Sequence, residues 1–404
     1  MADRTAGEKT AGVLSQRPQL HVAYANALIA TRGYGAPETT EAFTKARESA
    51  AGDKDAPERL AADFGLWAGG YLRGDLPSMR VHAAAFLEDI EAMPDSPEAG
   101  VAHRAAGITH WFAGEHREAR QHLEAALALF QPGRDDDLAF RFGHDAGVGA
   151  MLYLAIALWP LGDAGRAVSL VDGAQARIAG LAHIGTLAYG KFHTAVFELM
   201  RGDLLRAAPY AVELAQHARE HDLPLWRAWG IFLEGLVRAK SGGPGGLEEI
   251  RRGDQLLRNQ NVLIFDGLLK IGLAEAEARA GDPERAIATV DEALATAERT
   301  GHRAFDAELH RVRGEILLER DPANTAPAEE ALQTAVAAAK QQGTRSFELR
   351  AALSLAKLYK STGRPVDAHG VLAPALKGFS PTLEMPEIAE AHALLGDLSH
   401  PSAG

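Results

Sequence analysis

Small and apolar residues recur along the chain in a fixed register with short polar turns. Each turn contains a glycine that is usually followed by an acidic residue, as in RGDLL at 201–205 and AGDPE at 280–284. The turn glycines are Gly74, Gly114, Gly162, Gly202, Gly281 and Gly363, most of them about forty residues from the next turn. A period of this length predicts an array of stacked helical repeats.

Small residues also recur on the helices that flank each turn. Five positions after the turn glycine stand Ala119, Ala167, Ala207, Ala286 and Ala368, and seven positions further on stand Ala126, Ala174, Ala293 and Ala375, with Leu214 in the remaining copy. Twelve positions before the first alanine stand Gly107, Ala155, Ala195, Ala274 and Ala356. Small side chains let two helices approach closely, so each unit is expected to be a helix–turn–helix hairpin.

The turn chemistry supports this prediction. Glycine ends a helix in the left-handed cap conformation, and an acidic residue favours the positive end of the next helix. A second set of turns divides residues 19–396 into about eighteen helices, or about nine hairpins. We therefore expect an all-α fold, a single α-solenoid without a domain boundary. A flexible tail is expected at 1–18 and a disordered tail at 397–404.

The small positions resemble those of the tetratricopeptide repeat (TPR). Two departures from that motif are clear, since most of its aromatic positions are absent and the period is nearer 40 than 34 residues. Each helix is therefore expected to be longer by about one turn.

Four blocks carry a more specific resemblance: residues 27–48, 223–235, 306–318 and 346–376. In this order they resemble the carboxy-terminal, MalT-like repeat region of large bacterial signalling proteins. In those proteins a class III adenylate or guanylate cyclase domain, or a DNA-binding domain, precedes a signal-transduction ATPase and then the array. The chain has no G-x-x-x-x-G-K-[ST] phosphate loop; the AGEKT stretch at residues 6–10 lacks the glycine before its lysine. The resemblance therefore implies the array alone.

Composition excludes several classes of function. The net charge of −12 and the lack of a basic run argue against nucleic-acid binding, and the absence of cysteine excludes thiolate chemistry. The uncharged run at 146–162 is shorter than the roughly 20 apolar residues of a membrane span. We expect it to form a buried helix. With no secretory signal at the amino end, a cytoplasmic protein is expected.

Two groups of histidines are candidate metal ligands. His217, Glu220 and His221 form an H-x-x-E-H pattern on one helical turn, which could bind Zn²⁺ if a third ligand were available. Glu298 lies two repeats away, too far for that role, so a solvated helix end is favoured. Of His103, His110, His116 and His122, at most two are expected to converge. We predict no metal, no cofactor and no catalytic residue.

The register also identifies the side chains that point inward from the first helix of each hairpin. In the central repeats they are apolar or aromatic, apart from Arg104: Arg104, Ile108, Trp111, Leu152, Ile156, Trp159, Tyr189, Phe192, Trp229 and Phe232. These ten residues, the predicted groove set, could form a concave binding groove. Alternatively, tight coiling would bring them together as a core. Towards the end, the same positions become Glu275, Arg350 and Lys357.

The leading hypothesis is a non-enzymatic TPR-like module that binds a protein or peptide and relays that event to an ATPase or cyclase domain in cis or in trans. A small-molecule sensor that binds a sugar-like effector in the concave groove is the first alternative. A zinc hydrolase using His217 and His221 is the second alternative, and it would lose activity in His217→Ala.

Overall fold

The computed structural model describes residues 18–29, 32–52, 57–382 and 384–399, and all regular structure within them is helical. Residues 18–29 are helical, and the labelled helices are α2 (Pro37–Ser49), α3 (Pro57–Arg73), α4 (Leu76–Asp89), α5 (Pro97–Phe112), α6 (His116–Leu129), α7 (Leu138–Phe142), α8 (Ala146–Leu158), α9 (Ala164–Ile178), α10 (Ile184–Arg201), α11 (Leu204–Glu220), α12 (Pro224–Lys240), α13 (Gly246–Asn259), α14 (Asp266–Arg279), α15 (Pro283–Thr300), α16 (Asp306–Arg320), α17 (Ala326–Gln342), α18 (Arg345–Ser361), α19 (Pro365–Leu376) and α20 (Glu387–Ser399). The expected all-α solenoid is confirmed.

Consecutive helices pack as hairpins, beginning with α3 and α4 and ending with α18 and α19, while α20 covers the last pair. Each hairpin turn is formed as the sequence predicts. Gly202, for example, ends α10 with a φ of 85°, and the Asp203 side chain accepts a hydrogen bond of 3.0 Å from the backbone N–H of Arg206. The short helix α7 is an insertion between α6 and α8 that the repeat pattern does not predict.

The small positions bring the two helices of a hairpin into contact. A Cβ on Gly107 would lie 2.6 Å from Cγ of Leu123 and 3.1 Å from the carbonyl oxygen of Ala119. Only glycine therefore fits on α5 at this distance from α6.

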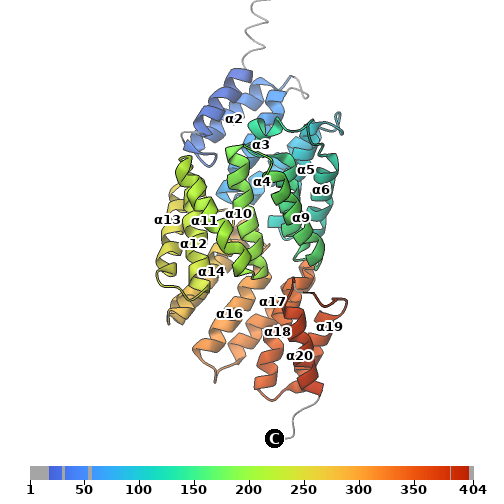
Figure 1. Cartoon of the computed structure of the whole chain (residues 1–404), viewed down its shortest axis with the longest axis vertical. Coiled ribbons are helices and arrows are strands. Elements are labelled where there is room, and N and C mark those ends of the chain that lie inside the picture. The colour runs from blue at the N-terminus through green and yellow to red at the C-terminus, as the bar shows by residue number, and fades with distance from the viewer. Residues whose placement is uncertain (1–17, 30–31, 53–56, 383, 400–404) are drawn as a thin grey trace, which may run out of the picture.

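Later hairpins stack directly on earlier ones. The backbone N–H of Leu263, before α14, donates a hydrogen bond of 2.8 Å to the carbonyl of Leu72 at the end of α3. In the same way, the backbone N–H of Arg303, before α16, donates a hydrogen bond of 2.8 Å to the carbonyl of Phe112 at the end of α5. The superhelix thus completes one turn after about five hairpins, and its second turn packs against its first (Figure 1).

The boundaries differ slightly from those expected. Helix α20 continues to Ser399, so the helical array extends beyond the expected end at 396. Pro18, assigned to the expected tail, is already helical. The rest of that tail at 1–17, which includes the AGEKT stretch, and the last residues at 400–404 lie outside the described part of the chain.

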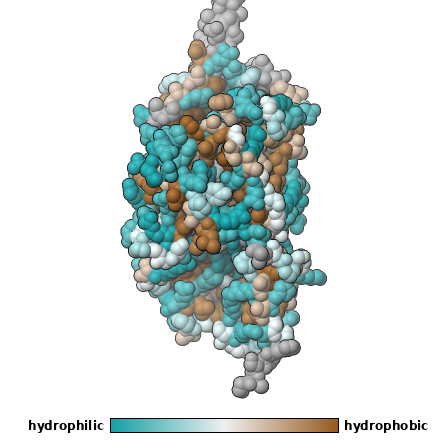
Figure 2. All heavy atoms as spheres, viewed as in Figure 1, coloured by the Kyte–Doolittle hydropathy of each residue, from teal (hydrophilic) through white to brown (hydrophobic). Residues whose placement is uncertain are grey.

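The apolar run at 146–162 forms α8 and the turn after it, and its helix is buried almost throughout. Within the described residues, no helix is both long and apolar enough to cross a membrane. Figure 2 shows hydrophilic residues over much of one face, with apolar residues in small separate patches. Leu205 and Phe140 are among the exposed apolar side chains.

Candidate functional site

The predicted groove set is buried. All ten side chains are at most 7% exposed: Arg104, Ile108 and Trp111 on α5, Leu152, Ile156 and Trp159 at α8, Tyr189 and Phe192 on α10, and Trp229 and Phe232 on α12. Members on neighbouring helices contact one another, as Phe192 of α10 and Trp229 of α12 do with ring centroids 4.6 Å apart. Of the two alternatives, the open groove is wrong for this conformation, because tight coiling turns these residues into core.

Phe265 completes that core from outside the repeat pattern. It precedes α14, and its ring lies 5.1 Å from Phe112, 5.7 Å from Phe192 and 6.2 Å from Trp229. Its φ of 62° is unusual for a residue with a Cβ. The strained backbone places the ring on the axis, and no sequence signal identified this residue.

An accessible cavity lies further along the axis, towards the carboxy end. It has a volume of about 280 Å³ and is walled mainly by α12, α14, α16 and α18. Leu236, Ile271 and Leu353 contribute its apolar wall. The inward positions that the sequence marks as polar, Glu275, Arg350 and Lys357, all line it as well.

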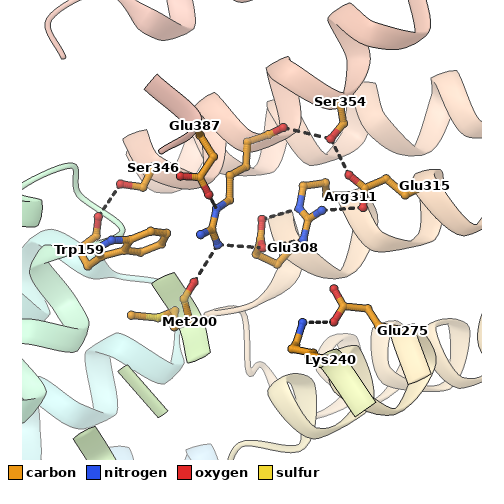
Figure 3. Close-up of polar contacts among 11 residues, drawn as sticks. Trp159, Met200, Lys240, Glu275, Glu308, Arg311, Glu315, Ser346, Ser354 and Glu387 are labelled. Carbon is orange, nitrogen blue, oxygen red and sulfur yellow. Dashed lines mark hydrogen bonds and ion pairs between the residues drawn. The ribbon is translucent and has the colours of Figure 1, made fainter. Parts of the chain in front are cut away.

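Ion pairs and hydrogen bonds link several of the residues that line this cavity (Figure 3). On α16, Arg311 donates two hydrogen bonds to Glu308, at 2.9 and 3.0 Å, and one of 2.7 Å to Glu315. The hydroxyl of Ser354 on α18 donates to Glu315 over 2.6 Å. Across the cavity, Lys240 of α12 pairs with Glu275 of α14.

Arg350 connects both turns of the superhelix at this cavity. Its guanidinium donates hydrogen bonds to Glu387 of α20 at 2.5 Å and to the Met200 carbonyl of α10 at 2.8 Å. It also lies 4.5 Å from the centroid of the Trp159 ring, where a cation–π contact is favourable. A single side chain therefore joins α10, α18 and α20 beside the cavity.

The buried charges of the network stabilise one another. Burial raises the pKa of Glu308, but the attraction of Arg311 and Arg350 outweighs it and leaves the pKa below its usual value. Burial lowers the pKa of Arg311, but the attraction of Glu308 and Glu315 outweighs this effect and holds the pKa well above its usual value. At the rim, Lys357 and Glu390 pair at 2.7 Å while each remains about half exposed. These rim charges are therefore accessible to a partner.

The H-x-x-E-H cluster lies away from this cavity. Ligand atoms of His217, Glu220 and His221 come within 4.8 Å of one another, on the last turn of α11 and its cap. Nε2 of His217, however, already bonds to the backbone carbonyl of Ile184 at 3.0 Å. The helix-end position agrees with the sequence prediction, but the side chain of His217 is buried rather than solvated.

The other histidine prediction is wrong in one respect. Three of the four side chains converge, because the His122 ring lies 5.2 Å from that of His103 and 5.3 Å from that of His110. His116 instead is buried beside Trp111, at a centroid distance of 6.3 Å. The register placed His122 on the neighbouring helix correctly, but helix spacing alone did not show that its ring reaches between the other two.

Comparison with known proteins agrees with the fold. No family model matches the chain. An uncharacterized protein of Rhizobium meliloti (strain 1021) is 29% identical over 253 residues, which are 62% of this chain but only 24% of that protein. The matched region is thus a minor part of its relative.

Two solved structures match the chain to different extents. A Rap protein complexed with competence and sporulation factor matches 81% of this chain and 99% of its own, with a TM-score of 0.54 and 13% identity. A signal transduction ATPase with a TPR sensor from Pyrococcus horikoshii matches 89% of this chain and 53% of its own, with a TM-score of 0.43 and 13% identity. The likeness to the Rap structure, whose TM-score exceeds 0.5, agrees with the TPR-like helical-repeat fold of the chain.

Proposed function

We propose that this chain is a non-enzymatic regulatory module that binds a charged segment of a protein partner in the cavity of α12, α14, α16 and α18. The observation that carries the proposal is the position of Arg350. It lines the cavity and also joins helices from both turns of the superhelix. A partner that exchanges ion pairs there also changes how tightly the two turns are held.

The chemistry of the cavity favours a peptide with both charged and apolar side chains. Its wall combines Leu236, Ile271 and Leu353 with cations and carboxylates that are already paired. Paired charges discriminate against a partner that leaves one of them unpaired, so they provide specificity more than affinity.

In this proposal the module acts in the cytoplasm and relays partner binding to an ATPase or cyclase domain, in cis or in trans. The fold supports a relay, because stacked repeats distribute a change of curvature over many small interfaces. The likeness to the Rap structure, which is complexed with competence and sporulation factor, supports the binding part of this proposal.

The experiment is selection of peptides from a random library by the purified chain, followed by fluorescence anisotropy. Lys357→Glu inverts a charge on the cavity rim and should weaken binding by roughly tenfold or more. Lys360→Glu is the matched control, since it lies on α18 but pairs with Asp397 outside the cavity. Equal loss in both variants, or no selected peptide at all, would contradict the proposal.

A sugar-sensing module is the second candidate. The cavity of about 280 Å³ is close to the lower size limit of small-molecule pockets, roughly 300 Å³. The same two variants, titrated with oligosaccharides in place of peptides, distinguish this candidate from the first one.

A further inference from the structure

Arg104 is a buried cation without a paired carboxylate. It lies on α5, is 2% exposed, and its Nε and Nη1 atoms have no hydrogen-bond partner among the described residues. Other buried arginines are paired: Arg59 with Asp89, and Arg311 with Glu308. Burying an unpaired charge is strongly unfavourable, so its presence requires an explanation.

The surrounding structure holds the guanidinium in place without neutralising it. A Cβ on Gly149 would lie 2.4 Å from Nη1, so the side chain packs against the backbone of α8. The Phe64 ring centroid is 5.9 Å from the guanidinium carbon. The carboxylate of Asp145 is already bound by Arg177, at 2.6 and 2.9 Å. Glycine at 149 thus provides the space that the cation occupies.

Three more polar atoms near Arg104 lack partners in the described structure. They are Oη of Tyr189, Nε2 of His144 and Nε2 of His193. The Tyr189 ring stacks on His144 at 3.8 Å and contacts His193 at 3.9 Å. Burial raises the pKa of Tyr189, and the nearby Arg104 acts in the opposite direction. Unsatisfied donors and acceptors therefore gather around the unpaired cation.

The edge of this cluster lies close to the surface. His144 is only partly buried, and Tyr34, from the turn before α2, is partly exposed as well. Oη of Tyr34 lies 3.9 Å from the Cβ position of the exposed Gly143. Burial raises the pKa of Tyr34 to about 12, and the positive charge of Arg104 acts in the opposite direction. The shortest path to Arg104 therefore runs between these two loops, whose side chains must shift to admit a ligand.

We propose that Arg104, Tyr189 and His144 bind the carboxylate of a small organic anion at the amino-terminal end of the superhelix interior. A single guanidinium matches the charge of one carboxylate and can bond to both of its oxygens. The rings of Phe64 and Phe142, whose centroids are 5.0 Å apart, make the surroundings of the guanidinium apolar, which disfavours a strongly hydrated inorganic anion. This site is separate from the peptide-binding cavity.

The test uses trifluoroacetate as the carboxylate probe, followed by ¹⁹F NMR line broadening with the full chain. Wild type should broaden the signal in a saturable way, and acetate should reverse the effect. Arg104→Met should weaken binding by roughly tenfold or more, because a charge-assisted pair is lost. Tyr189→Phe, which removes only the hydroxyl group, should weaken it less. Arg166→Met, which changes an arginine on α9 that pairs with Glu124, is the control with unchanged binding.

Thermal unfolding without any added carboxylate distinguishes a binding role from a structural one. Replacement of an unpaired buried cation by an apolar side chain of similar length should raise the Tm. A lower Tm together with unchanged trifluoroacetate binding in Arg104→Met would overturn the proposal. So would an absence of broadening with wild type. Displacement of the probe by phosphate but not by acetate would overturn the choice of a carboxylate.

Discussion

The hydroxyl of Ser346 donates a hydrogen bond of 2.6 Å to the backbone carbonyl of Trp159, although 187 positions separate the two residues. The backbone N–H of Ser346 also donates to the adjacent carbonyl of Pro160 at 2.9 Å. These contacts attach the start of α18 to the end of α8. They fix the second turn of the superhelix on the first.

Loss of that hydroxyl should weaken the whole fold. Ser346→Ala removes one of two hydrogen bonds to the carbonyl of Trp159, since the backbone N–H of Gly162 also donates to it, and we expect the free energy of unfolding to fall by about 0.5–1.5 kcal/mol. Urea unfolding followed by circular dichroism measures the change. Ser169→Ala, which removes an exposed hydroxyl bonded within its own helix, should change stability by less than about 0.5 kcal/mol. Equal effects would show that the contact between turns contributes little.

Two helical glycines should respond in opposite directions to alanine. A Cβ on Gly253 of α13 would lie 2.6–2.7 Å from Phe232, including its backbone, so Gly253→Ala should cost about 1–3 kcal/mol. Gly370 of α19 has no atom within 4 Å of that position, and Gly370→Ala should stabilise the protein by up to about 1 kcal/mol. Denaturant midpoints measure both. Stabilisation by Gly253→Ala would mean that α12 and α13 can move apart freely.

Stability should fall as the pH decreases from 6.5 towards 4. Burial lowers the pKa of His116 and His302 to about 4, so the unfolded chain binds protons in this range while the folded chain does not. His116→Leu removes one such group, and the slope of unfolding free energy against pH should decrease by about one proton. Urea titrations between pH 4.5 and 7.5 test this prediction.

Leu123→Ala is the control for that experiment. It removes buried apolar volume on α6 without a titratable group, and it should lower stability by about 2–5 kcal/mol at every pH. If His116→Leu leaves the slope of unfolding free energy against pH unchanged, groups other than His116 cause the loss of stability in acid.

Arg350→Met should release the carboxy-terminal end of the array. The change leaves Glu387 and Glu308 without this cation in a largely buried site, at a cost of about 3–5 kcal/mol. Hydrogen exchange in α20 should therefore become faster. Arg364→Met removes more exposed pairs with Asp367 and Glu329 and should leave exchange in α20 unchanged. Protection of α20 that persists in Arg350→Met would show that apolar packing alone holds this helix.

The sequence by itself determined the hairpins. Their signals are local, since a glycine cap such as Gly202 and small residues such as Gly107 and Ala119 act within a single repeat. The change from apolar to polar inward positions at Glu275, Arg350 and Lys357 was also visible, because these residues keep the same register.

Only the tertiary structure decided how tightly the solenoid coils. The decisive contacts, such as Leu72 with Leu263, join residues from different turns of the superhelix, and no local pattern encodes their distance. This coiling turned the aromatic inward positions into core, brought Phe265 onto the axis, and left Arg104 buried without a carboxylate. A small rotation per repeat adds up over about five hairpins. Whether an inward side chain is buried or exposed therefore depends on residues far away in the sequence.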